Sequence, residues 1–277
     1  MKKEQRLAVA QQTVEIVQQG HYEVEGQRVE IGPAVRQCLD RTRLFSADEL
    51  AAIRDSLLSE PFERHDTTFE VANETTLEGL ARLTPVASGP IGVLNFASAR
   101  NPGGGFLKGA EAQEESLARC SALYASLTRA SSFYERHRAL SSALYTDAMI
   151  LSPGCPVIRA DSGALLPRPL LATFITSPAP NAGAAVQNHP NEVPRIGEVL
   201  VRRSELVLAL TAAEGAADLI LGAWGCGVFR NDPRVVATAF AKHLRGAWAG
   251  RFRRVLFSVY DTSPGTGTLR AFEEEFA

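Results

Sequence analysis

The sequence predicts an α/β fold with a mixed, mostly parallel sheet, and three observations carry this prediction. Short apolar runs of strand character alternate along the chain with segments whose apolar residues follow helical spacing. The run Pro90 to Phe96 (PIGVLNF) is almost continuously apolar, as expected for a strand that is buried on both faces. The run Leu219 to Ala223 leads into a glycine turn that is followed by a helix start. Such strand, loop and helix units build parallel sheets covered by helices.

Residues 1–64 are predicted to form a mostly helical accessory segment, and residues 65–277 the main domain. Apolar residues recur at helical spacing from Leu7 to Val17, and Gly20 is expected to end this helix. Alternation from Tyr22 to Ile31 predicts a short hairpin or an extended piece. Ser46 and Glu49 form a capping box, which marks the start of a further helix.

In the main domain, the pattern predicts six strands and five helices. The strands are expected at 67–71, 90–96, 148–152, 170–176, 219–223 and 255–260. The helices are expected after the Thr75–Glu78 capping box, over 117–127, over 196–215, after Asp232-Pro233, and in the acidic C-terminal residues.

Composition limits the classes of function. With a net charge of −2, the chain lacks the excess of Lys and Arg that binding to DNA phosphates requires, so no DNA partner is expected. The four cysteines show no C-x-x-C pair and indicate free thiols in a reducing compartment. Neither a signal-peptide core nor an apolar run long enough to cross a bilayer is present, so we expect a cytoplasmic protein without membrane contact.

The most informative stretch is a glycine loop followed by a carboxylate pair, Ala99 to Ser116. Near its start a turn is expected at Asn101-Pro102, and three consecutive glycines follow this turn directly. Consecutive glycines are useful where the backbone takes positive φ or approaches a ligand. The glycines are Gly103, Gly104 and Gly105, and the polar triplet before the next helix is Gln113, Glu114 and Glu115.

A second glycine loop follows the strand at 219–223. A Gly-x-Gly turn between a strand and a helix start can bind an anion, because unpaired N–H groups and the helix dipole converge there. The third glycine of the dinucleotide fingerprint is missing, and so is the Gly-Lys-Ser/Thr of a P-loop. The loop residues of interest are Gly225, Cys226, Gly227, Val228 and Phe229.

Together these motifs resemble the poly(ADP-ribose) glycohydrolase signature. The resemblance rests on the two glycine loops, the Gln-Glu-Glu triplet and the upstream Asn95 to Ser98, and it covers the chain from about Thr67 onward. Within this family, the sequence resembles the short bacterial-type enzymes in particular. It implies a three-layer α/β/α macrodomain at 65–277 that binds ADP-ribose, with the N-terminal helical extension added to it.

The resemblance also implies roles for single residues. Glu115 falls on the catalytic glutamate, and Glu114 on the neighbour that holds hydroxyls of the cleaved ribose. Asn101 would contact the same ribose, and both glycine loops the diphosphate, with Phe229 packed against the distal ribose. The adenine contacts are expected between Asn73 and Thr76.

The chemistry is consistent with these roles. Hydrolysis of a ribose–ribose bond passes through an oxocarbenium-like state, and the leaving oxygen needs a proton. Glu115 can supply it if its surroundings raise its pKa, and the ionised residue can then activate water. Adjacent residues of a helix point about 100° apart, so the pair does not flank one bond. We therefore expect one glutamate for chemistry and one for positioning, with no cofactor and no metal.

Several alternatives remain open. One alternative is that Glu111, Glu114 and Glu115 do no more than complement a helix dipole, and the two glycine loops argue against it. A nucleophilic Cys226 lacks a nearby histidine, and His189 with Glu192 is too small a set for a metal site.

Three functions fit the predicted fold and site. The chain could be a glycohydrolase that acts on poly(ADP-ribose) and poly-ADP-ribosylated proteins and releases ADP-ribose, here expected to be a monomer that cuts chain ends. It could instead be an ADP-ribose reader without catalysis, or a hydrolase that removes mono-ADP-ribose from proteins.

Overall fold

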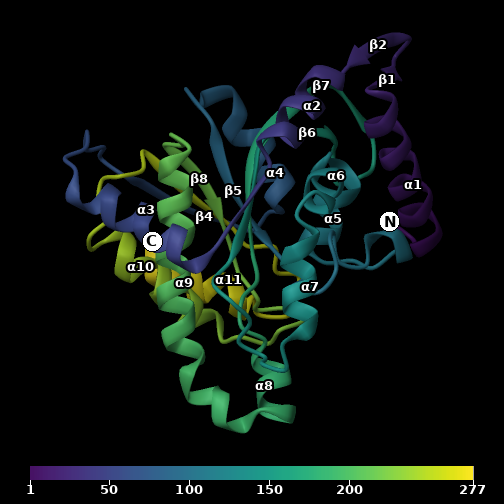
Figure 1. Ribbon diagram of the computed structural model, residues 1–277. Coiled ribbons are helices and arrows are strands. Elements are labelled where there is room, and N and C mark those ends of the chain that lie inside the picture. Colours follow the sequence, from purple (N-terminus) through teal and green to yellow (C-terminus); the bar gives the residue numbers. More distant parts are fainter. Residues whose placement is uncertain (277) are drawn as a thin grey trace.

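A seven-stranded mixed sheet forms the centre of the computed structural model, which describes residues 1–276 (Figure 1). Its strand order is β3-β6-β7-β5-β8-β9-β4, and the five strands from β7 to β4 are parallel. β6 pairs antiparallel with β7 and with β3. The strands are β3 (Arg43–Phe45), β4 (Thr68–Ala72), β5 (Ile91–Phe96), β6 (Met149–Arg159), β7 (Leu165–Ser177), β8 (Asp218–Leu221) and β9 (Arg254–Ser258). The expected mixed, mostly parallel sheet is confirmed.

Helices cover both faces of this sheet. One layer contains α3 (Ala47–Ser59), α9 (Ile196–Ala213), α10 (Pro233–Leu244) and α11 (Gly267–Phe276). The other contains α2 (Gly32–Arg41), α4 (Thr76–Leu83), α5 (Gln113–Cys120), α6 (Leu123–Thr128) and α7 (Ser131–Ala139). Figure 1 shows α9 on one side of the strands and α5, α6 and α7 on the other.

Alternation along the buried strands produces the two cores. In β8, Leu219 and Leu221 pack with the α9 and α10 layer, whereas Ile220 packs with the opposite layer. In β9, Val255 packs with the α9 and α10 layer and Leu256 with the opposite layer. Because successive side chains of a strand point to opposite faces, these apolar runs serve both layers. The predicted three-layer α/β/α architecture is confirmed.

The N-terminal residues form α1 (Lys3–Gln19), the hairpin of β1 (His21–Val24) and β2 (Gln27–Glu30), and then α2, β3 and α3. The predicted hairpin and the capping box of Ser46 and Glu49 are both present. Strand β3 was not predicted, and its pairing with β6 adds this segment to the edge of the main sheet. The domain boundary after residue 64 therefore stays a prediction.

Two further differences have local causes. The strand predicted at 148–152 is the start of the longer β6, in which Pro153 and Gly154 lie at a bulge between Ser152 and Cys155, opposite β7. The helix predicted over 117–127 is two helices, α5 and α6, because Ser121 leaves the helix to form a β-bridge with Val157.

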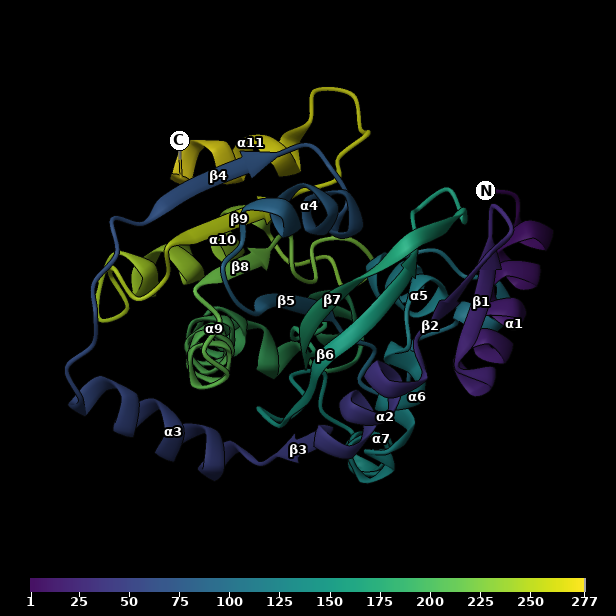
Figure 2. The same cartoon turned by 90° about the horizontal axis from the view of Figure 1, so that it is seen from above.

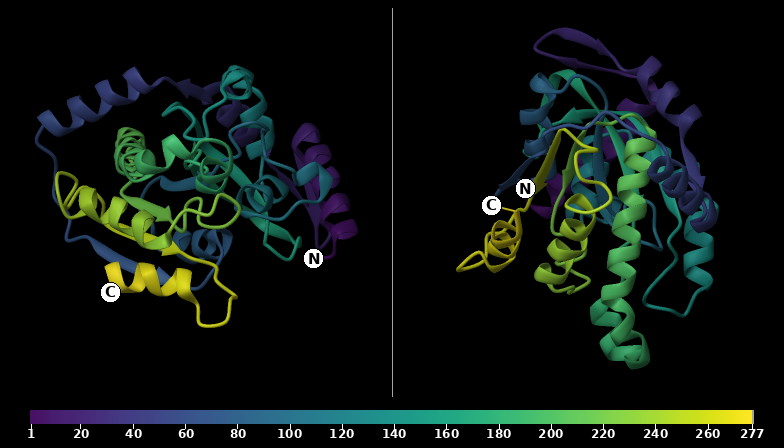
Figure 3. Two further views of the ribbon diagram at one scale, coloured as in Figure 1. Left: turned by 90° about the horizontal axis from the view of Figure 1, so that it is seen from below. Right: turned by 90° about the vertical axis from the view of Figure 1, so that its left-hand side faces the viewer.

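The remaining elements complete the layers. Neither α7 nor α8 (Ala182–Asn188) was predicted, and three short 3-10 turns, η1 (Thr84–Val86), η2 (Phe106–Lys108) and η3 (Pro190–Arg195), connect longer elements. Helix α11 lies beside the edge strand β4, as Figure 3 shows. Within residues 1–276, the apolar length needed to cross a membrane is reached by none of the helices.

Candidate active site

The two glycine loops leave neighbouring strands at the same edge of the sheet. β5 and β8 are parallel partners, with Val93 opposite Ile220, so their carboxyl ends point the same way. The second loop starts against the end of β5, because a Cβ built on Gly222 would lie 3.0 Å from the Phe96 ring. Ligands of open α/β sheets bind outside such carboxyl ends.

The first loop takes a conformation that requires glycine. Gly103 and Gly104 have φ values of 67° and 59°, in the left-handed region. A Cβ on Gly104 would lie 2.2 Å from Oε1 of Glu115, and one on Gly103 would lie 3.0 Å from the Phe106 ring. The loop backbone therefore lies directly against the predicted catalytic carboxylate.

Gln113 joins the start of α5 to the end of β5. Its Oε1 accepts a hydrogen bond from the Phe96 N–H at 2.9 Å, and its Nε2 donates to the Leu94 carbonyl at 2.8 Å. The same Nε2 donates to Thr76 Oγ1 at 3.1 Å, and Thr76 is buried at the start of α4. The side chain thus uses its amide to fix the helix that carries the two glutamates.

Glu114 is the buried member of the pair. Its side chain is 2% exposed, and its carboxylate accepts from the Ser98 N–H at 2.6 Å and from Asn95 Nδ2 at 3.2 Å. Burial raises the pKa of Glu114 to about 8, and the nearby Glu115 charge adds to the rise, while the bonds from Ser98 and Asn95 oppose it.

Glu115 points to the glycine loop instead. Its carboxylate accepts from the Gly105 N–H at 2.9 Å, and the residue is half-buried. The two glutamates therefore contact different partners, Glu114 toward the strand and Glu115 toward the loop. This divergence follows from the angle between adjacent residues of a helix.

Asn101 lies at the start of the first glycine loop, and Asn73 lies on another loop of this edge. Asn101 is exposed, and its N–H donates to Ser98 Oγ at 3.2 Å. Asn73 follows β4 and exchanges two hydrogen bonds with the Asp261 backbone, each 3.0 Å long. Asp261 follows β9, which is the parallel neighbour of β4. Asn73 therefore links the loops that follow these two strands.

The second glycine loop is closed by Asn231. Asn231 Nδ2 donates to the Gly225 carbonyl at 3.1 Å and to the Pro180 carbonyl at 2.8 Å. Gly225 has a φ of 73°, and a Cβ there would lie 2.5 Å from Asn231 Nδ2. Trp224 is fully buried and donates through Nε1 to the Ser177 carbonyl at 2.9 Å, which fixes the loop to the end of β7.

The tip of this loop is more open. Gly227 is exposed, and the Val228 side chain is 78% exposed. Phe229 is half-buried, with its ring centroid 6.0 Å from that of Tyr145. Burial raises the pKa of the Cys226 thiol to about 12, which disfavours the thiolate that a nucleophile requires.

A metal site finds no support in the described chain. Among residues 1–276, no group of three or more His, Cys, Asp and Glu side chains could hold a metal ion. The Glu192 carboxylate of the His189 and Glu192 pair instead accepts from the Ala143 N–H at 2.9 Å.

Sequence reasoning missed the structural partners of the site. Asn95 and Ser98 lie in the stretch that carries the resemblance, and Asn231 follows the second glycine loop, but no role was predicted for these three residues. The signal for Asn95 is a polar residue in an otherwise apolar buried strand, since such a group needs a buried partner. Backbone donors such as the Ser98 N–H leave no signal in a sequence.

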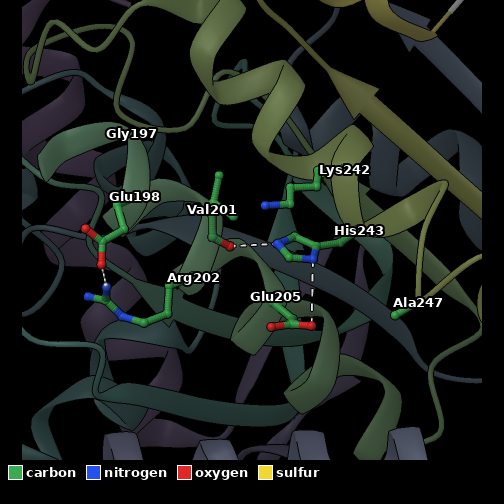
Figure 4. Close-up of a pocket in the computed structure, with 8 residues that line it drawn as sticks. All are labelled: Gly197, Glu198, Val201, Arg202, Glu205, Lys242, His243 and Ala247. Atoms are coloured by element: carbon green, nitrogen blue, oxygen red, sulfur yellow. Dashed lines mark hydrogen bonds and ion pairs between the residues drawn. The ribbon is translucent and has the colours of Figure 1, made fainter.

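A hollow of about 590 Å³ lies elsewhere, between α9 and α10 (Figure 4). There, His243 Nε2 lies 2.8 Å from the Val201 carbonyl, and its Nδ1 lies 3.7 Å from Glu205. The lining residues are Gly197, Glu198, Val201, Arg202, Glu205, Lys242, His243 and Ala247, so this hollow contains none of the predicted site residues.

The sheet, its two helical layers and the glycine loops at neighbouring strand ends define a macrodomain-type protein with an acidic pair beside the loops. A scan against protein-family models matches residues 10–160 to the catalytic domain of microbial-type PARG, poly(ADP-ribose) glycohydrolase. The chain belongs to this family and is a glycohydrolase. The resemblance seen in the sequence is thereby confirmed. A comparison with curated protein sequences gave no match.

Solved structures agree over most of the chain. The poly(ADP-ribose) glycohydrolase of Thermomonospora curvata bound to the inhibitor ADP-HPD is 46% identical, with a TM-score of 0.91 and coverage of 98% of this chain and 99% of that one. Another structure of this enzyme gives a TM-score of 0.94 at 46% identity, covering 99% and 100%. The enzyme of Deinococcus radiodurans in complex with ADP-ribose is 44% identical, with a TM-score of 0.83 and coverage of 89% and 98%.

Proposed function

We propose that this protein hydrolyses the ribose–ribose O-glycosidic bonds of poly(ADP-ribose) and releases ADP-ribose. Family membership supports the reaction, and the relatives solved with ADP-ribose and ADP-HPD support the ligand. The observation that carries the site is the contact of Glu115 with the glycine loop, where Gly105 donates to its carboxylate at 2.9 Å. A half-buried acid that lies against a loop suited to a diphosphate can reach the glycosidic bond of the ribose attached to that diphosphate.

In this mechanism Glu115 is the general acid and then the general base. Protonated Glu115 gives its proton to the leaving 2′-oxygen as the ribose takes on oxocarbenium character. The ionised carboxylate then removes a proton from the attacking water. The Gly105 N–H stabilises the ionised form of Glu115 that exists between the two steps.

Glu114 is assigned to the hydroxyls of the cleaved ribose. Its bonds to Asn95 and Ser98 fix it beside the loop, and its pKa of about 8 favours the protonated form at neutral pH. A neutral Glu114 avoids two adjacent negative charges near an anionic ligand. It can also donate its proton in a hydrogen bond, a role that an ionised carboxylate cannot fill.

The ligand contacts follow the glycine loops. We assign the diphosphate to the two glycine loops, Gly103, Gly104 and Gly105 and Gly225, Cys226, Gly227, Val228 and Phe229, with Phe229 also packed on a ribose. Asn101 is exposed at the first loop and suited to a ribose contact. Gln113 donates a hydrogen bond to Thr76, so we assign these two residues to fixing the edge of the sheet at which the ligand binds.

We further propose that cleavage proceeds from chain ends. The segment after β9 is held at the ligand edge by Asp261, which accepts from Ser263 N–H at 2.9 Å and Thr268 N–H at 2.8 Å. A firmly held segment there would block a polymer that continues past the adenosine ribose. The partners we propose are poly(ADP-ribose) and poly-ADP-ribosylated proteins, bound by a cytoplasmic monomer.

The deciding experiment measures ADP-ribose release from an auto-modified poly(ADP-ribose) polymerase. We expect the wild type to release ADP-ribose, and Glu115→Gln to lose at least about 10²-fold in rate while it still binds ADP-ribose. Glu198→Gln, an exposed acid in the first turn of α9, is the matched control and should keep full activity.

The alternatives give different results in the same assay. If the wild type binds ADP-ribose and releases none from polymer, the protein is a reader. If it releases ADP-ribose only from mono-ADP-ribosylated protein, it is a mono-ADP-ribosyl-protein hydrolase.

A further inference from the structure

Helix α1 covers the segment that joins the first glycine loop to α5, as Figure 2 shows at the N-terminal side of the molecule. Ala10 of this helix is fully buried in a small cluster with Phe106 and Ala118. Gly109 has a φ of 74°, and a Cβ there would lie 2.9 Å from the Lys3 side chain. The helix therefore lies directly on the backbone of this segment.

Arg6 fastens the helix to the segment. Its Nε donates to the Gly109 carbonyl at 2.9 Å, and one terminal nitrogen lies 2.6 Å from the Glu111 carboxylate. The Arg6 side chain is only 14% exposed. A planar guanidinium that meets a carbonyl and a carboxylate together fixes their relative position better than a point charge does.

The anchored segment leads directly to Glu115. The carbonyl of Gly105 accepts from the N–H groups of Lys108 at 2.9 Å and Ala110 at 3.1 Å. The N–H of the same Gly105 donates to the Glu115 carboxylate. The residue that holds the acid is thus itself held by the turn that Arg6 anchors.

Helix α1 also contacts the other end of α5. Thr13 Oγ1 donates to the Arg119 carbonyl at 2.6 Å and accepts from Arg159 Nε at 2.9 Å. The Arg119 guanidinium donates back to the Ala110 carbonyl at 2.7 Å. Contacts from one helix therefore reach both the loop before Glu115 and the helix turn after it.

We propose that α1 belongs to the catalytic apparatus and that Arg6 is a positioning residue for the acid Glu115. This inference rests on the proposed role of Glu115. Misplacement of a reacting group by about 1 Å costs on the order of 10²-fold in rate, so a loosened turn lowers turnover before it lowers binding. Arg6 also precedes residue 10, where the family match begins.

The test compares Arg6→Ala with Arg28→Ala, which removes an exposed arginine paired with Glu30 in the β1–β2 hairpin of the same N-terminal region. We expect Arg6→Ala to lower kcat at least about tenfold while the Kd for ADP-ribose changes less than about threefold. Arg28→Ala should match the wild type in both. Circular dichroism at the assay temperature checks that each variant is folded.

Arg6→Lys keeps the charge facing Glu111 but lacks the fork, so we expect an intermediate kcat at unchanged Kd. It also decides the question if Arg6→Ala does not fold. The proposal is overturned if folded Arg6→Ala, or Arg6→Lys in its place, keeps the wild-type kcat, or if kcat and Kd change together. A wild type that releases no ADP-ribose would instead contradict the proposed function, so the two failures are distinguishable.

Discussion

Gly104 and Glu115 lie so close that no side chain fits between them. A Cβ on Gly104 would come within 2.2 Å of Oε1 of Glu115 and 2.8 Å of its carboxyl carbon. The glycine also has a φ of 59°, which disfavours any other residue. The backbone of the glycine loop therefore fixes where the Glu115 carboxylate can lie.

Gly104→Ala should disable the site while the fold survives. We expect a loss of at least about 10²-fold in kcat/KM, because the new methyl group displaces the Glu115 carboxylate. The left-handed backbone adds a destabilisation of about 1–2 kcal/mol. Gly89→Ala is the control, since a Cβ there meets no atom of residues 1–276 within 4 Å. Equal activity of the two variants would disprove the argument.

The fold and the site differed in how far sequence could predict them. The buried strands and the capping boxes were predictable because each is encoded by local residues, such as Ser46 with Glu49. Strand β3 was not, since three residues become a strand only through pairing with β6. The glutamate pair was found by its motif, but the burial that separates Glu114 from Glu115 arises from β5 and its following loop, distant in sequence.

Gln113→Glu tests how α5 is fixed to β5. The new carboxylate can still accept from the Phe96 N–H, but it cannot donate to the Leu94 carbonyl or to Thr76. The Leu94 carbonyl loses this donor, and a buried acceptor left without a partner costs about 1–3 kcal/mol. We expect a lower urea midpoint and a lower kcat.

The control for this substitution is Gln187→Glu on α8, where the side chain is exposed and should tolerate the change. If Gln113→Glu and Gln187→Glu unfold at the same urea concentration, the amide of Gln113 does not hold the helix.

Glu114 gives the stability of the fold a definite pH dependence. Its folded-state pKa of about 8 lies above the ordinary 4.5, so the folded state binds the proton more tightly. The resulting stabilisation is complete below pH 4.5 and is lost as the pH rises to about 8. Glu114→Gln cannot titrate, so the stability difference between wild type and variant should move against the wild type over this range. Urea unfolding at half-unit pH steps measures it, and a constant difference would exclude the raised pKa.

His137 produces the opposite slope in a lower pH range. The residue is fully buried, with Nδ1 2.8 Å from the Phe133 carbonyl and Nε2 accepting from the Thr146 N–H at 3.1 Å. A ring that donates through Nδ1 and accepts through Nε2 is neutral. Burial lowers the pKa of His137, with the nearby Arg203 and Arg136 charges adding to the effect.

In the unfolded state His137 therefore takes up a proton near pH 6.5, whereas in the folded state it takes up this proton only at a lower pH. The contribution of His137 is fully present above 6.5 and is lost as the pH falls through the folded-state pKa. We expect His137→Gln to be less stable than the wild type at pH 7 and the gap to narrow toward pH 5. Urea unfolding of both proteins at these two pH values measures the gap, with His189→Gln, at a half-buried histidine after α8, as the control. A gap that is equal at the two pH values would show that His137 takes up its proton equally well in the folded and the unfolded chain.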